Sequence, residues 1–86
     1  MRLLLQQKPN AGESPKFVQL TLQQDLLGGW TLLREAGQIG GKTQLRREQF
    51  LEREAAVAAF EKARDAQVRK GFQVMFAQGA VAPKNG

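Results

Sequence analysis

The sequence predicts an α+β fold, in which a twisted antiparallel sheet of four or five strands carries one helix on a face. Short runs with a period of two, separated by turns that contain glycine or proline, fill the first part of the chain and indicate strands. One long stretch of helical periodicity follows them. The chain has 86 residues, which suits one domain, because neither half of a divided chain would bury enough surface to fold alone.

The first two predicted strands are Arg2–Gln7 and Lys16–Gln24. A loop with two prolines, a glycine and an asparagine, Lys8–Pro15, separates them. In each strand the apolar residues at alternate positions fall on one face, which is typical of a half-buried strand. These alternating residues are Leu3, Leu5, Val18, Leu20 and Leu22.

The next two predicted strands are Trp30–Glu35 and Thr43–Phe50. The hairpin turn Asp25–Gly29 precedes the first of them, and its two glycines can adopt a positive φ. The second strand is rich in charge, and we expect it to be mostly exposed. Sequential strands joined by short turns predict an antiparallel meander. The glycines between these two strands are Gly37, Gly40 and Gly41.

Glu52–Lys70 is the predicted helix, with acidic residues in its first turn and basic residues in its last turn that complement the helix dipole. Gly71 is its expected C′ cap. The apolar segment Phe72–Phe76 forms either a final strand or a strip packed on the sheet. We therefore expect a single domain at residues 1–76 and a disordered tail at residues 77–86. The apolar positions with helical spacing are Ala56, Ala59, Phe60 and Ala63.

The charge balance favours a polyanionic partner. Thirteen lysines and arginines against eight aspartates and glutamates give a net charge of +5. Such a charge attracts nucleic acid through long-range electrostatics and counterion release. The alternative is that these side chains serve solubility alone.

Composition argues against an enzyme, a metal site or a cofactor. The chain has no cysteine and no histidine, so it lacks thiolate ligands, the commonest metal ligand and the commonest general base. The apolar residues near the N-terminus are too few for a secretory signal, and no run approaches the length that spans a bilayer. We therefore expect a soluble cytoplasmic protein.

One segment matches the permissive form of a phosphate-binding loop. Ala36–Thr43 reads AGQIGGKT, and that motif requires a preceding strand, a following helix and, in nucleotide hydrolases, an acidic residue that holds Mg²⁺. Neither Asp25 nor Asp65 follows an apolar strand in the required way. The parallel α/β sheet of such enzymes also needs more residues than this chain has. These features argue against hydrolysis of ATP or GTP.

The order of the sequence features points to a known family. The hairpin sequence DLLGGW, the strand end LLREAGQIG, an arginine-rich strand, an Ala/Glu-rich helix and KGF follow one another along Lys16–Phe76. This order resembles the small bacterial members of the WGR domain family. The resemblance implies a non-catalytic module that binds nucleic acid or another protein. In the poly(ADP-ribose) polymerases the family's domain sits at a DNA end, where its signature Trp packs on a terminal sugar and its signature Arg contacts the DNA.

This chain departs from the family at two of the three signature positions, which fall on Ala36, Gly37 and Gln38. Ala36 offers no stacking platform, and Gln38 can form hydrogen bonds but cannot neutralise a phosphate. Trp30 aligns with an aromatic residue of the strand interior, so we expect it in the core. End recognition in the family manner is therefore not expected from these side chains alone.

The charges around the signature turn are the candidate binding residues. Adjacent strand residues point to opposite faces, so only one of Arg46 and Arg47 can share a surface with Arg34. The alternative is a solvated strand whose charges prevent edge pairing. The candidate nucleic-acid-binding residues are Arg34, Gln38, Lys42, Arg46 and Arg47.

We expect weak, sequence-independent binding of DNA, in preference to RNA, through backbone phosphates. The alternative is a protein-interaction module that has lost nucleic-acid binding and docks a partner protein on the surface around Ala36–Gly40. We expect no membrane partner and no small-molecule substrate. A second basic cluster, on the helix, is mixed with acidic residues and is expected to be a solvated face; it comprises Lys62, Arg64, Arg69 and Lys70.

Overall fold

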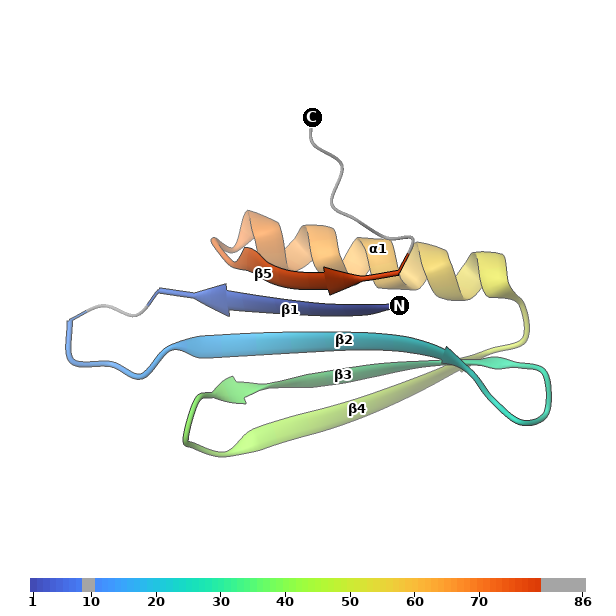
Figure 1. The fold of residues 1–86 in the computed structure, drawn as a ribbon, viewed down its shortest axis with the longest axis horizontal. Coiled ribbons are helices and arrows are strands. Elements are labelled where there is room, and N and C mark those ends of the chain that lie inside the picture. The colour runs from blue at the N-terminus through green and yellow to red at the C-terminus, as the bar shows by residue number, and fades with distance from the viewer. Residues whose placement is uncertain (9–10, 80–86) are drawn as a thin grey trace.

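The computed structural model describes residues 1–8 and 11–79, and Figure 1 shows their five strands and one helix. Neighbouring strands are antiparallel, and their order across the sheet is β4-β3-β2-β1-β5. Helix α1 packs on one face, so the predicted α+β architecture is confirmed. The elements are β1 (Arg2–Gln7), β2 (Lys16–Gln24), β3 (Trp30–Gln38), β4 (Thr43–Phe50), α1 (Arg53–Arg69) and β5 (Gln73–Gln78).

The path of the chain explains the order of the strands. The first four strands form the predicted meander, and α1 then carries the chain across one face to the far edge of the sheet. There β5 pairs with β1, so the segment after the helix is a strand and not a packed strip. This strand extends past the expected domain end at residue 76, because Ala77 and Gln78 pair with Leu3 and Arg2. Residues 80–86 of the expected tail lie outside the described residues.

Strand β3 is longer than the sequence predicts. It ends at Gln38 and not at Glu35, and the added residues pair with β2. The segment that matches a phosphate-binding loop is therefore a β hairpin, whose last residue, Thr43, begins β4 where the motif requires a helix. The fold thus agrees with the argument against a nucleotide hydrolase.

The core lies between α1 and the sheet. Alternate residues of β1, β2 and β3 meet one face of the helix, and small alanines let the helix backbone approach the strands. Burial of one leucine stabilises a fold by about 1.5–3 kcal/mol, so this layer supplies most of the stability. Trp30 is half-buried and packs against this core, as predicted. The buried apolar residues are Leu3, Leu5, Val18, Leu20, Leu22, Leu32, Ala56, Phe60 and Ala63.

Helix α1 ends in a Schellman motif that determines where Phe72 lies. The N–H of Phe72 donates to the Gln67 carbonyl, and the N–H of Gly71 donates to the Val68 carbonyl, each at 3.0 Å. Gly71 has a φ of 95°, which glycine adopts without the strain that a side chain would add. The predicted C′ glycine is therefore present, and it turns the chain back toward the sheet.

The helix is one residue shorter at each end than predicted, and one of its basic residues is not solvated. Arg64 is only 6% exposed, because it follows Phe60 by about one turn and lies on the buried face of the helix. Its Nε donates to Asp65 Oδ1 at 2.9 Å. The predicted solvated cluster is thus wrong at this position. In the described part of the chain, no helix is long and apolar enough to cross a membrane.

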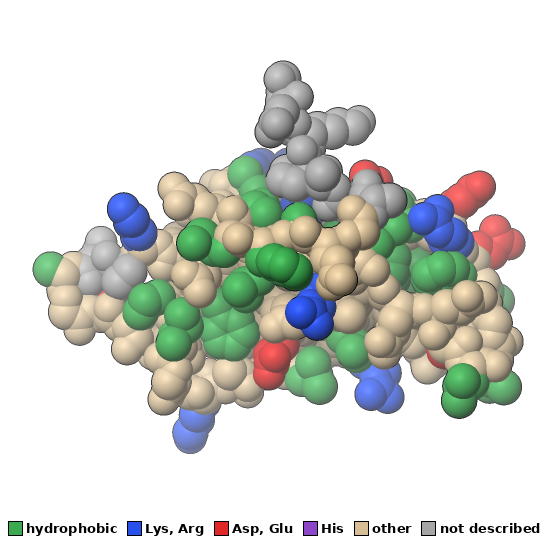
Figure 2. Space-filling view, in the orientation of Figure 1, with side chains coloured by type: hydrophobic (Ala, Val, Ile, Leu, Met, Phe, Trp, Pro, Cys, Tyr) green, Lys and Arg blue, Asp and Glu red, His purple; other side chains and the backbone are tan. Residues whose placement is uncertain are grey.

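The sheet face away from α1 is partly apolar. Figure 2, in which the helix lies behind the sheet, shows hydrophobic side chains gathered over the middle of this face. The strand register places Leu4, Phe17, Leu33 and Leu45 on it. Arg47 is opposite Leu33 and therefore also belongs to this face.

Candidate functional site

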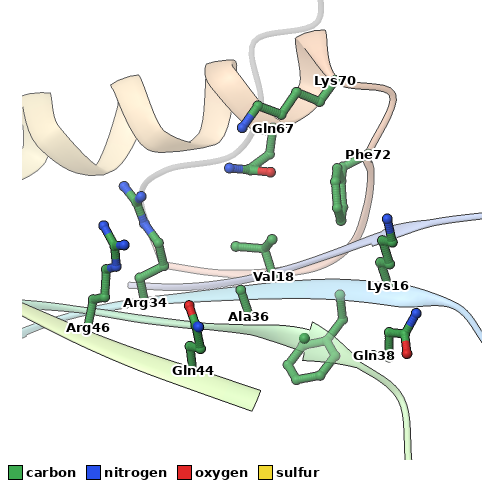
Figure 3. Close-up of a pocket in the computed structure, with 12 residues that line it drawn as sticks. Lys16, Val18, Arg34, Ala36, Gln38, Gln44, Arg46, Gln67, Lys70 and Phe72 are labelled. Atoms are coloured by element: carbon green, nitrogen blue, oxygen red, sulfur yellow. The ribbon is translucent and has the colours of Figure 1, made fainter. Parts of the chain in front are cut away.

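A groove of about 470 Å³ opens between the C-terminal end of α1 and the helix-side face of β2, β3 and β4. Figure 3 shows side chains from these elements converging on it. It combines basic side chains, amides and an apolar floor. The basic residues are Lys16, Arg34, Arg46 and Lys70; the amides are Gln38, Gln44 and Gln67; the apolar residues include Val18, Ala36 and Phe72.

Arg34 and Arg46 supply two guanidinium groups to one end of the groove. They are direct partners in the β3–β4 register, so both lie on the helix side of the sheet. Figure 3 shows both side chains rising from their strands toward α1. No aspartate or glutamate lines the groove, and within the described residues neither arginine takes part in an ion pair. Their donors therefore face the groove, where they can hold an anion.

The structure brings most of the predicted site residues to one end of the molecule and separates one from them. Gln38 lines the groove, and Lys42 lines an adjoining hollow that shares part of its wall. Arg46 lines the groove as well. Arg47 pairs with Leu33 and lies on the opposite face, so it is not part of this site.

Sequence reasoning misses two lysines of the groove. Lys16 begins β2 and pairs with Gln38, a register that counting back from the hairpin turn could have identified. Lys70 is the C-cap of α1, and Figure 3 shows its side chain extending over the groove. Its carbonyl accepts a hydrogen bond of 2.8 Å from Gln7 Nε2, which ties this end of the helix to β1. The position of Lys70 depends on how the helix docks, for which the sequence carries no local signal.

Gly37 allows β3 and β4 to lie close together beside the groove. A Cβ at this position would overlap the carbonyl oxygen of Lys42 and would lie 2.9 Å from the Cα of Thr43. Glycine is therefore required for the close approach of the two strands. The one retained residue of the signature is thus the one that the backbone needs, and it lines the groove together with its neighbours Ala36 and Gln38.

The groove is suited to electrostatic and packing contacts with a polyanion. Its cations attract negative charge, and its floor can pack against an uncharged part of the same ligand. Among the described residues, no three side chains gather that could hold a metal ion.

Comparison with known proteins agrees with the sequence pattern. The family model of the WGR domain matches residues 1–77, which include every residue of the groove. Neither a curated protein nor a solved structure matches the chain significantly.

Proposed function

The chain belongs to the WGR domain family, and we propose that it is a non-catalytic module that binds DNA without sequence preference. The family consists of small binding-type domains and is of the nucleic-acid-binding type. The observation that supports the proposal best is the pair formed by Arg34 and Arg46. Two guanidinium groups share one face, in a groove that no carboxylate of the described residues lines.

The proposed ligand atoms are the oxygens of backbone phosphates. A guanidinium group can hold one phosphate through two parallel hydrogen bonds. Gln38 ends β3 and Lys42 directly precedes β4, so both lie at the same end of the sheet, where they would extend the contacts along the nucleic-acid backbone. Phosphate contacts position a nucleic acid but do not read its sequence, so the expected binding is sequence-independent.

The test measures the binding of labelled duplex DNA over a range of salt concentrations. Arg34→Gln and Arg46→Gln are each expected to weaken binding and to reduce the log–log salt slope by about 0.9, the value for one phosphate contact in B-DNA. Arg47→Gln is the matched control, because it removes the same charge from the opposite face of the same strand. Its salt slope should stay close to that of the unmodified protein.

Two outcomes would contradict the proposal at different levels. Equal losses of DNA affinity in Arg34→Gln, Arg46→Gln and Arg47→Gln would show that binding depends on net charge and not on the groove. No detectable binding to DNA or RNA at about 50 mM salt would contradict nucleic-acid binding itself. The second outcome would favour a protein-interaction module.

One observation favours such a protein contact as a second candidate function. Leu26 and Leu27, at the tip of the β2–β3 hairpin, are 104% and 98% exposed. Asp25 holds this turn, because its Oδ1 accepts the N–H groups of Leu27 and Gly29 at 2.9 Å each. Large apolar side chains exposed together are typical of protein–protein contacts. The tip and the groove lie at opposite ends of the sheet, so a protein and DNA could bind together.

A further inference from the structure

We propose that the groove holds one unpaired nucleotide, with its base on the apolar floor and its phosphate at the two arginines. This inference rests on the proposed function, and it adds that nucleic acid with unpaired bases binds more tightly than a blunt duplex. A base inside a duplex is stacked and paired, so it cannot enter the groove, whereas an unpaired base can be splayed out.

The groove has the room and the apolar surface that a base needs. Its volume of about 470 Å³ lies within the range of small-molecule sites, about 300–1,000 Å³. Ala36 and Val18 are partners in the β2–β3 register and form a floor of small side chains. Phe72 stands at the end of this floor, as Figure 3 shows. An aromatic ring in this place can pack against the ring of a base.

Three glutamines around the floor have unused hydrogen-bonding groups. In the described part of the chain, the side-chain amides of Gln38, Gln44 and Gln67 make no hydrogen bond. An amide presents both a donor and an acceptor, as does the exposed Watson–Crick edge of an unpaired base. A phosphate can only accept hydrogen bonds from the amide NH₂ groups. A base can also donate to the amide oxygens, so it would use both halves of each amide.

The pair of arginines and the aromatic ring lie at opposite ends of the groove, and Lys16 adds a positive charge beside the ring. Figure 3 shows Arg34 and Arg46 at one end, and Phe72 and Lys16 at the other. A nucleotide can span these two ends, because its flat base is joined through a sugar to a charged phosphate. The pair of arginines thus suits the phosphate of a nucleotide, and the apolar floor with Phe72 suits its base.

The test compares a blunt DNA duplex with the same duplex extended by a few unpaired thymidines at one end. Fluorescence anisotropy at fixed salt should show the extended duplex binding at least about fivefold more tightly, the low end of what one stacked base contributes. An extension of the same length built from abasic residues is the control, because it adds the same phosphates without bases. It should bind no more than about twofold better than the blunt duplex, since added phosphates contribute charge alone.

Variants of the floor and the wall test where the base lies. Ala36→Leu fills the floor, and Phe72→Leu removes the aromatic ring while keeping an apolar side chain. Both are expected to abolish the preference for unpaired thymidines while the blunt duplex still binds. Phe76→Leu is the matched control for loss of an aromatic ring, because Phe76 is exposed and pairs with Leu4 on the opposite face.

A second pair of variants avoids any change in packing. Gln44→Ala removes an exposed amide on the groove side of β4, and Gln49→Ala removes one on the other side of the same strand. The first should reduce the preference for the thymidine extension, and the second should leave it unchanged.

Three outcomes would overturn the inference. The abasic extension could bind as well as the thymidine extension, or the preference could survive in both Ala36→Leu and Gln44→Ala. In either case, duplex binding that still depends on Arg34 and Arg46 would leave the proposed function intact. In the third outcome, polyglutamate binds at the groove and no nucleic acid binds. This result would overturn both the inference and the proposed DNA binding, and it would indicate an acidic protein partner.

Discussion

Arg34 on β3 and Arg46 on β4 stand directly opposite each other in the antiparallel register, although both are positively charged. Like charges at opposed positions of two strands destabilise the pair by up to about 1 kcal/mol. Within the described residues no carboxylate forms an ion pair with either arginine. The sheet therefore carries an unfavourable pair at the groove, which a bound polyanion would relieve.

Arg46→Thr should stabilise the protein while it weakens DNA binding. The substitution removes the like-charge pair, so the free energy of unfolding should rise by about 0.2–1 kcal/mol relative to the control below. For a domain of this size a rise of 1 kcal/mol corresponds to about 4–8 °C in Tm. Thermal unfolding at low salt, followed by circular dichroism, measures the change.

Arg47→Thr is the control for that prediction. It introduces the same strand-favouring residue and removes the same charge, but Arg47 faces Leu33 and not another cation. A gain of equal size in this control would attribute the effect to strand propensity or net charge, and the opposed pair would not be its cause.

Gly37→Ala should destabilise the β3–β4 hairpin. The new Cβ would overlap the Lys42 carbonyl oxygen, so the two strands would have to separate, at a cost of about 1–3 kcal/mol or more. Urea denaturation measures the loss. Gly41→Ala is the control, because a Cβ there would lie 3.4 Å from the Cβ of Gln38 and needs no backbone shift. Similar losses in the two variants would contradict the packing explanation.

Arg64→Ala should lower the free energy of unfolding by about 1–3 kcal/mol, because the buried aliphatic part of the side chain is lost from the helix face. Arg64→Met keeps an unbranched apolar side chain and should recover most of the loss. Asp65→Asn should cost less than about 1 kcal/mol, since the Asp65 side chain is 54% exposed and the ion pair is screened by water. A larger loss in Asp65→Asn than in Arg64→Ala would show that the ion pair matters more than the packing.

Asp25→Ala should loosen the β2–β3 hairpin. One carboxylate oxygen accepts two backbone N–H groups, so its removal should cost about 1–3 kcal/mol in urea denaturation. Asp25→Asn keeps an oxygen acceptor and should cost less. Leu26→Ser, at a fully exposed position of the same turn, should change the stability by less than about 0.5 kcal/mol. A loss in Leu26→Ser as large as in Asp25→Ala would mean that the turn depends on apolar contacts.

Strand β4 is predicted with its observed bounds from its charge-rich sequence, and it is exposed at every residue except Phe50. The alternation of apolar residues predicts β1 and β2 with the bounds that the structure has. It does so because the pleat of a strand buries every second side chain, which leaves a direct record in the sequence. The end of β3 is the exception. Gly37 indicates a turn when only neighbouring residues are considered, whereas in the sheet it allows the close approach of β4.

The sequence by itself determined the fold class, the helix to within one residue at each end, and the positive charge around the signature turn. These features depend on periodicity and composition, which are properties of short segments. Only the tertiary structure decided that Arg46 and not Arg47 shares a face with Arg34, and that Lys16 and Lys70 join them. That choice depends on strand register and on the docking of α1, and both are set by contacts between residues far apart in the chain.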